Sequence, residues 1–346
     1  MSSAIQLPFF AQSLGGSPAL GKLPEASWSA GACIVNSCDT LAQSASSRQP
    51  SCVSSSMPVR LIINADDFGL TRGVNRAIAE LHEARAVTSA TLMANGAAFD
   101  DAVAVALDRP SLGVGCHIVL VDGTPVSDPA SVPTLLGPNR RTFRTSLADF
   151  ALGVLRGAIT QDDIEREALA QIQKLQHAGL KLTHVDTHKH THLLARVTRP
   201  VIRALEQSGI RCIRNPFEPR WAATLGGSTR RSLFVRAFQP GHRRFEASPP
   251  IAAHRILTTR GTIGISATGH LNSSTLSGLL QNIPDGTWEL VCHPGYNDSD
   301  LDAITTRLRT HRETELQALL AAFAKSSSNP LHPSGLKLIH YGELGT

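Results

Sequence analysis

The sequence has few aromatic residues, no long apolar run and only a small excess of positive charge. Aromatic residues make up 5% of the 346 residues, and the formal net charge is +5. No segment approaches the roughly 18 apolar residues of a membrane helix, and the N-terminus lacks the basic and apolar regions of a secretory signal. The doublets Arg230-Arg231 and Arg243-Arg244 have no interleaved aromatic residues, which disfavours nucleic-acid binding. We therefore expect a cytoplasmic protein without a membrane span.

Cysteine is also scarce, with six residues and no Cys-x-x-Cys pair. Cys116, Cys212 and Cys292 lie in apolar, strand-like segments, which predicts reduced and buried thiols. The other cysteines lie within residues 1–56, a stretch rich in Ser, Ala, Gly and Pro that has no sustained hydrophobic period. We expect 1–56 to be a poorly ordered extension and 57–346 to form a single domain.

Strand and helix patterns alternate through the rest of the chain. Strands are predicted at 59–65, 89–93, 112–120, 210–214, 263–265, 288–292 and 337–340. Helices are predicted at 75–83, 99–107, 162–177, 199–208, 271–280 and 302–324. Residues 121–145 form a long predicted loop, and the Arg-rich segment 220–260 has no clear pattern. Repeated βα units predict an α/β fold whose parallel strands close, or nearly close, into a (β/α) barrel.

Side chains that bind metals or transfer protons follow several of these strands. Asp66 and Asp67 end the first strand, His117 lies late in the third, and His293 follows the strand 288–292. Because the carboxyl ends of parallel barrel strands form one rim, these groups are expected to meet there. Two adjacent carboxylates repel each other unless one is paired, and a bound cation would relieve that repulsion.

The segment 183–192 reads Thr-His-Val-Asp-Thr-His-Lys-His-Thr-His. Alternate side chains of an extended chain share one face. That face would carry His184, Asp186, His188, His190 and His192. So many imidazoles and a carboxylate are poor core residues unless they are partnered, which favours a metal site over a solvated His-rich loop.

This set of groups is typical of metal-assisted hydrolysis. A divalent ion held by one carboxylate and two imidazoles keeps positions open for water and substrate. We predict Asp67, His117 and His188 as ligands, Asp66 as general base and His293 as general acid. Spacing alone does not decide between His188 and His190. The residues predicted to orient the ligands or contact the substrate are Asp186, His190, His192, Arg214 and Tyr296.

These motifs carry a family resemblance. The Asn-Ala-Asp-Asp-Phe-Gly run at 64–69, the segments 113–117 and 183–192, and Cys-His-Pro at 292–294 resemble the YdjC-like carbohydrate deacetylase family. The resemblance implies a barrel-like deacetylase fold, hydrolysis of N-acetyl groups on sugars such as chitooligosaccharides, and a homodimer. It also implies magnesium or a similar divalent ion and favours His188 as the ligand. Ligand softness alone favours zinc as much as magnesium.

Two other functions compete with the deacetylase. The first is a metal-dependent phosphoesterase on a similar barrel, for which the arginine surplus and the His-x-His pattern are the relevant features. The second is a carbohydrate- or metal-binding protein without catalytic turnover. The presence of both Asp66 and His293, the predicted base and acid, disfavours that second alternative.

Overall fold

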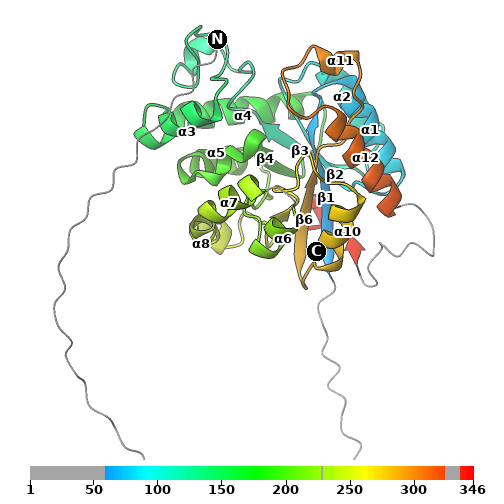
Figure 1. Ribbon diagram of the computed structural model, residues 1–346. Coiled ribbons are helices and arrows are strands. Elements are labelled where there is room, and N and C mark those ends of the chain that lie inside the picture. Colours follow the sequence, from blue (N-terminus) through cyan, green and yellow to red (C-terminus); the bar gives the residue numbers. More distant parts are fainter. Residues whose placement is uncertain (1–58, 227–228, 324–335) are drawn as a thin grey trace, which may run out of the picture. The chain divides into compact units, whose positions relative to one another are not determined.

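The computed structural model describes residues 59–226, 229–323 and 336–346 (Figure 1). The strands are β1 (Arg60–Phe68), β2 (Ser89–Leu92), β3 (Gly113–Ile118), β4 (His184–Thr187), β5 (Thr262–Ile263), β6 (Thr287–Cys292) and β7 (Lys337–Leu338). The α-helices are α1 (Arg72–Glu83), α2 (Phe99–Leu107), α3 (Leu147–Arg156), α4 (Gln161–His177), α5 (Ala195–Ser208), α6 (Arg220–Leu225), α7 (Thr229–Phe238), α8 (Pro240–Glu246), α9 (Pro249–Ala252), α10 (Ser273–Gln281), α11 (Ser299–Asp302) and α12 (Thr310–Phe323). The short 3-10 helices are η1 (Pro129–Ser131), η2 (His188–Leu193) and η3 (Tyr341–Glu343). The predicted extension 1–56, with its cysteines, lies outside the described residues.

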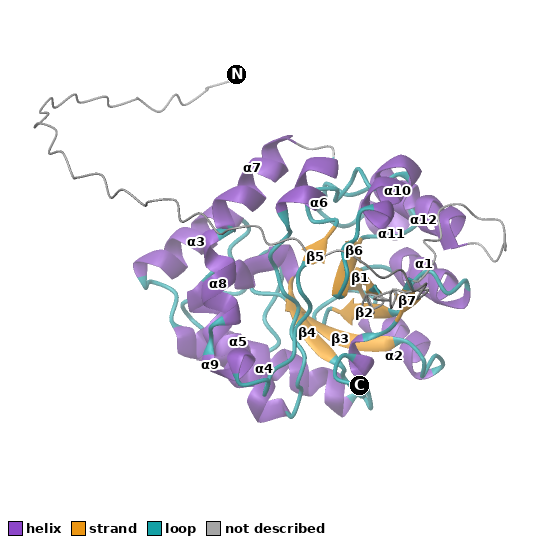
Figure 2. Cartoon of the chain, turned by 90° about the horizontal axis from the view of Figure 1, so that it is seen from below, coloured by secondary structure: helices purple, strands orange, loops and turns teal. Residues whose placement is uncertain are grey.

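The strands form one parallel sheet in the order β4-β3-β2-β1-β6-β5, and β7 also pairs with β1. Past β4 the sheet continues irregularly: the Arg214 amide donates to the Val185 carbonyl, and the Thr262 amide of β5 donates to the Phe217 carbonyl. The segment 211–217 therefore connects the two ends of the curled sheet, and Figure 2 shows the strands surrounded by helices. The predicted α/β, barrel-like fold with parallel strands is confirmed.

The central strand β1 shows why this sequence forms a buried sheet. From Leu61 to Phe68 every residue of β1 is buried, as expected for a parallel strand covered on both faces. Leu61 and Ile63 belong to the large core under the helices, whereas Ile62 packs with Tyr341 in a smaller cluster. Asn64 continues the parity of Ile62, and its side chain bonds to other polar groups inside the barrel.

Some predicted elements differ from those in the structure. The predicted strand 210–214 forms only isolated bridges at Cys212 and Ile213, and Pro216, which has no N–H to donate, follows shortly after. The predicted helix 302–324 is two helices, α11 and α12, separated by residues 303–309. The Arg-rich segment 220–260, which had no assigned pattern, contains α6, α7, α8 and α9.

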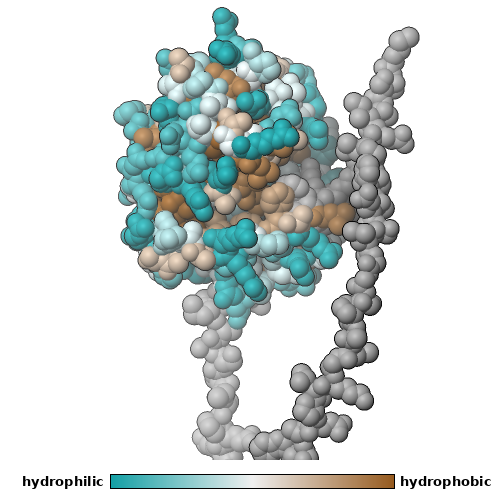
Figure 3. Space-filling model, turned by 90° about the vertical axis from the view of Figure 1, so that its left-hand side faces the viewer, coloured by the Kyte–Doolittle hydropathy of each residue, from teal (hydrophilic) through white to brown (hydrophobic). Residues whose placement is uncertain are grey.

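The cysteines and the protein surface agree with the sequence-based predictions. Cys116, Cys212 and Cys292 are free and buried, as predicted. Within the described residues, no helix is both long and apolar enough to cross a membrane. Figure 3 shows a largely polar face with apolar residues gathered near its middle. The large apolar side chains exposed in the described part are Leu107, Leu152, Leu155, Leu225 and Leu233.

Candidate active site

The end of β1 departs from regular strand geometry where its two carboxylates lie. The pairing of β1 with β2 shifts register between Ala65 and Phe68. Asp67 has φ 64°, a left-handed conformation that is uncommon for a residue with a side chain. Such irregularities redirect side chains and are frequent at functional sites. Asp66 and Asp67 consequently meet different partners, although they are neighbours in the chain.

Asp67, His117 and His188 form a compact group, which we call the rim trio. The Asp67 Oδ1 atom lies 3.6 Å from His117 Nε2 and 3.4 Å from His188 Nδ1. The two imidazole nitrogens are 3.2 Å apart. Asp67 Oδ1 is buried and has no hydrogen-bond partner among the described residues. One carboxylate and two imidazoles around an unpaired oxygen suit a divalent cation, so the residues present fit such an ion.

The orientation of His117 is set by Asp186 on the neighbouring strand. His117 and Asp186 are directly paired between β3 and β4, and His117 Nδ1 lies 2.7 Å from Asp186 Oδ1. With Nδ1–H donating to that carboxylate, Nε2 faces the other members of the rim trio. Burial would lower the pKa of His117, but the charge and hydrogen bond of Asp186 outweigh it and raise the pKa to about 9.

The His-rich segment does not continue as a strand. β4 ends at Thr187, and η2 follows, with Lys189 at φ 54° and His190 at φ 51°. The expectation that 184–192 presents one face is therefore wrong beyond Thr187, because left-handed residues end the alternation of side chains. His188 turns toward Asp67.

His190 and His192 lie outside the rim trio. His190 Nδ1 is buried and has no hydrogen-bond partner in the described part of the chain, and burial holds the His190 pKa well below its usual value. His192 Nδ1 contacts the Thr187 hydroxyl at 2.6 Å, and His192 Nε2 lies 3.3 Å from the Arg214 carbonyl oxygen. His192 thus ties η2 to the segment 211–217. The geometry separates His188 from His190, which spacing left open.

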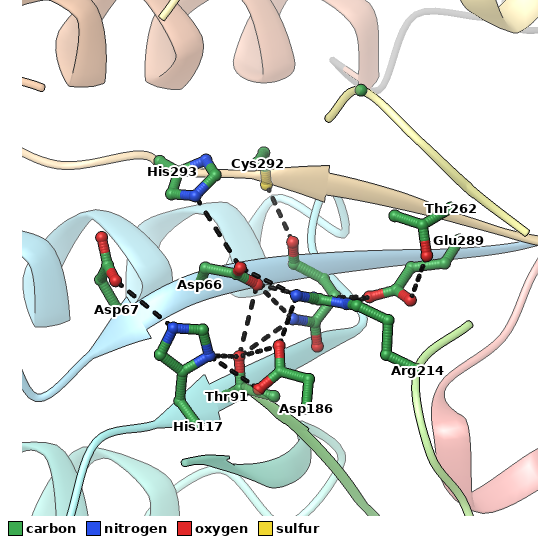
Figure 4. A network of polar contacts seen from close by, with 12 residues as sticks. Asp66, Asp67, Thr91, His117, Asp186, Arg214, Thr262, Glu289, Cys292 and His293 are labelled. Atoms are coloured by element: carbon green, nitrogen blue, oxygen red, sulfur yellow. Dashed lines mark hydrogen bonds and ion pairs between the residues drawn. The ribbon is translucent and has the colours of Figure 1, made fainter. Parts of the chain in front are cut away.

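Arg214 lies inside the barrel among three carboxylates (Figure 4). Its guanidinium donates to both Asp66 oxygens at 2.6 and 2.9 Å, and its Nε donates to Glu289 at 2.8 Å. A further contact of 2.5 Å joins it to Asp186. Arg214 is fully buried. It therefore orients Asp66 and Asp186 from inside the barrel. Because it is shielded from solvent, it is not open to an arriving substrate.

Asp66 accepts several hydrogen bonds, most of them on Oδ1, whereas Oδ2 accepts one from Arg214. Besides Arg214, it accepts hydrogen bonds from Asn64 Nδ2 at 3.0 Å and from the Thr91 hydroxyl at 3.4 Å. Burial would raise the pKa of Asp66, but the charges of Arg214 and His117 outweigh it and hold the pKa well below its usual value. Asp66 is therefore ionised.

His293 approaches Asp66 from the end of β6. Its Nε2 lies 3.8 Å from Asp66 Oδ2, and its buried Nδ1 has no hydrogen-bond partner within residues 59–226, 229–323 and 336–346. The structure thus brings the predicted base and the predicted acid together. Tyr296 lies apart: its hydroxyl donates to Glu80, and its ring lies 4.0 Å from the Arg76 guanidinium. Tyr296 therefore contacts α1 and not the rim trio.

Two residues of α12 that the sequence analysis did not single out also reach this site. Arg312 donates to Asp67 Oδ2 at 2.6 Å, and Glu315 accepts the His293 amide at 2.6 Å. Both are buried on the side of α12 that also carries buried Leu316 and Leu319. A sequence signal existed, because charged residues at helical spacing on an apolar face require buried partners.

Comparison with known proteins identifies the family. Residues 60–327 match the model of the family described as YdjC-like protein. The chain belongs to the YdjC-like family. A carbohydrate deacetylase from Brevibacillus brevis is 33% identical over 290 residues, which cover 83% of this YdjC-like chain and 100% of that relative. A human carbohydrate deacetylase is 34% identical over 251 residues, covering 69% of this chain and 75% of the relative.

A solved structure supports the fold of this YdjC-like protein. A crystal structure of an Enterococcus faecalis V583 protein, for which cellobiose-phosphate cleavage has been suggested, aligns with a TM-score of 0.63. The alignment covers 82% of this chain and 98% of that protein at 21% sequence identity. At that identity the likeness shows a shared fold and nothing about the reaction.

Proposed function

We propose that this YdjC-like protein is a metal-dependent hydrolase that removes N-acetyl groups from carbohydrates. The observation that carries the proposal is the buried, unpaired Asp67 Oδ1 facing His117 and His188. A buried carboxylate oxygen without a donor is costly, and a cation would satisfy it. The relatives named carbohydrate deacetylase supply the reaction class.

In this proposal Asp67, His117 and His188 hold the ion. When bound, a divalent ion polarises a carbonyl group and lowers the pKa of water. The donor set suits zinc on ligand softness, while the family resemblance favours magnesium, and we place magnesium first. Asp186 accepts the Nδ1 proton of His117, so Nε2 faces the site and becomes available to the ion once its own proton is lost.

Asp66 and His293 carry the proton transfers. Water attacks the acetamide carbonyl carbon while Asp66 accepts its proton, and His293 then protonates the sugar nitrogen as the C–N bond breaks. The products are acetate and a free amino sugar. Arg214 keeps Asp66 ionised and therefore able to accept a proton, although the same ion pair weakens Asp66 as a base.

The cations near the site argue against the phosphoesterase alternative. Arg214 is paired with carboxylates, and Lys189 pairs with Asp122 at 2.9 Å. Arg312 donates to Asp67 through Nη2, and its other terminal nitrogen, Nη1, is enclosed by the protein because the residue is only 1% exposed. A phosphate group is usually recognised by arginine or lysine side chains that are free to donate to it. An N-acetyl sugar of the chitooligosaccharide type, which is uncharged, is therefore the proposed substrate.

The test measures acetate released from N-acetylglucosamine oligomers by metal-stripped protein, before and after magnesium or zinc is restored. We expect release only with an added ion, and the more active ion identifies the cofactor. Phosphate release from simple esters is measured in parallel. Metal binding without acetate release from these and other N-acetylated glycans, or metal-dependent phosphate release, would refute the proposed function.

A further inference from the structure

We infer that α12 positions both halves of the active site, with Arg312 orienting the metal ligand Asp67 and Glu315 placing His293. This inference rests on the proposed function, because it takes the roles of Asp67 and His293 from it. It adds two positioning residues that lie in the last part of the described chain, far in sequence from the motifs at the strand ends.

Arg312 holds one oxygen of Asp67 and leaves the other free. Its NH2 donates to Asp67 Oδ2 at 2.6 Å, and its Nε donates to the Leu308 carbonyl at 3.1 Å, which fixes the guanidinium plane. With Oδ2 held there, the unpaired Oδ1 faces the two imidazoles. Asp67 lies at φ 64°, outside strand geometry, so side-chain contacts rather than the β1 ladder set its direction.

Gly295, in the loop that follows β6, packs closely against the Arg312 side chain. A Cβ atom built at Gly295 would lie 3.0 Å from Arg312 Cδ and 3.0 Å from Val74 Cγ2. At such distances a Cβ at residue 295 would push Arg312 or Val74 aside by a few tenths of an ångström. Gly295 therefore offers a way to disturb the position of Arg312 without removing its charge.

Glu315 acts on the other half of the site. Its two oxygens accept the amides of His293 at 2.6 Å and of Gly269 at 2.8 Å. Gly269 lies in the loop that follows β5, so one carboxylate joins the ends of two neighbouring strands. Glu315 reaches the His293 main chain and leaves the imidazole free, which fits a role in placing that ring beside Asp66.

Stability alone is a weak reason for these buried charges. Replacing a buried ion pair by apolar residues of similar size is often neutral or stabilising. Arg312 and Glu315 are each 1% exposed, on a helix side that otherwise carries leucines and alanines. A positioning role gives a reason for charges at those places: each fixes the direction of one group whose geometry the reaction requires.

The first experiment measures metal affinity by calorimetry on metal-stripped protein. Losing an outer partner of a metal ligand typically weakens binding by about 10–100-fold, and we expect R312K to fall in that range because an ammonium lacks the fixed fork of Arg. G295A is expected to weaken binding by at least about threefold through displacement of Arg312. R309K, three residues earlier in the segment before α12 and part-exposed, is the control and should stay within about twofold.

The second experiment separates Glu315 from Arg312. E315Q is expected to bind the metal within about threefold of wild type while kcat falls by about tenfold or more, because His293 is misplaced. E313Q is the control, since Glu313 accepts the amide of Asn297, three residues beyond Pro294, at 3.1 Å and does not touch His293.

The outcomes distinguish this inference from the proposed function. If wild-type protein binds no divalent ion, the proposed function fails. If wild type binds the ion and H188A releases it, but R312K and G295A both bind within twofold of wild type, the role of Arg312 is refuted. If R312K does not fold, G295A decides. Equal loss of metal affinity in E315Q and R312K would refute the division of roles on α12.

Discussion

Two regions of the barrel interior treat their carboxylates in opposite ways. Around Arg214, the carboxylates of Asp66, Asp186 and Glu289 all receive charged donors, and Tyr341 adds a hydrogen bond to Glu289 at 2.5 Å. In the rim trio, Asp67 Oδ1 accepts no hydrogen bond from the described residues and has only the imidazole nitrogens of His117 and His188 nearby, at 3.6 and 3.4 Å. The two regions are separated by one peptide bond of β1, between Asp66 and Asp67.

The difference assigns tasks to the two regions. A fully paired network in a low-dielectric interior is rigid and costly to disturb, so it serves as a frame. An unpaired buried oxygen is costly as it stands and gains most from a ligand. The Arg214 network is the frame inside the barrel, and the unsatisfied oxygen of Asp67 lies in the rim trio above it.

The largest effect is expected from H188A, which removes a rim-trio ligand. We expect metal affinity to fall by more than the roughly 10–100-fold that loss of an outer partner costs, and acetate release to disappear with it. H190A is the matched control, because His190 lies two residues on in the same turn but outside the trio. Calorimetry on both variants decides; equal losses, or a larger loss in H190A, would reverse the ligand assignment.

D66N tests the residue of the Arg214 network that is also the proposed general base. Arg214 keeps Asp186 and Glu289 as partners, so the fold should survive the change. Metal affinity should stay within about threefold, while the rate of acetate release falls by about 10²–10⁴-fold because the base is lost. The two quantities are measured on the same preparation. An unchanged rate would remove Asp66 from the proton transfer.

The pH dependence of metal affinity follows from His117. Its pKa of about 9 means that the metal-free protein holds this imidazole protonated at pH 7, so an ion must displace that proton. Affinity should rise about tenfold per pH unit between pH 7 and 8 and level off above pH 9. The raised pKa of His117 also contributes to the stability of the metal-free fold. This stabilisation is fully present below about pH 6.5 and is lost as the pH rises through about 9.

Calorimetry in buffers of different ionisation enthalpy measures this proton, and about one proton per ion should be released at pH 7. D186N supplies the comparison, since Asp186 is the main group that raises the pKa of His117. That variant should release fewer protons and bind the ion more weakly, by about 10–100-fold, because His117 loses its orienting partner. Binding without proton release in wild type would contradict the protonation state of His117.

The rim was predictable because it depends on one rule of parallel barrels. Buried-strand patterns fixed where the strands end, and the carboxyl ends of such strands meet on one edge. Asp66, Asp67, His117 and His293 were placed near each other on that basis, and the structure brings them together. At these positions the strand pattern of the sequence and the geometry of a parallel barrel predict the same location.

The supporting groups depend on contacts that no local pattern encodes. Arg312 is 245 residues from Asp67, and Arg214 is 75 residues from Glu289. The turn at Lys189 and His190 was missed for a different reason: neither residue is a glycine or asparagine, the usual signals of a left-handed backbone. Tertiary packing holds these residues, so their conformation follows from the fold and not from their own preference.

Y296F, with the smallest expected effect, tests where the site ends. The Tyr296 hydroxyl donates to Glu80 and the Tyr296 ring faces Arg76, so Tyr296 connects the loop after β6 to α1. Loss of one part-buried hydrogen bond should cost about 1 kcal/mol or less, and kcat/KM should stay within about twofold. Thermal melting and steady-state kinetics on N-acetylglucosamine oligomers measure both. A fall in kcat/KM of tenfold or more with unchanged melting would mean that the sugar reaches Tyr296, and the division between frame and rim would then extend along the loop to α1.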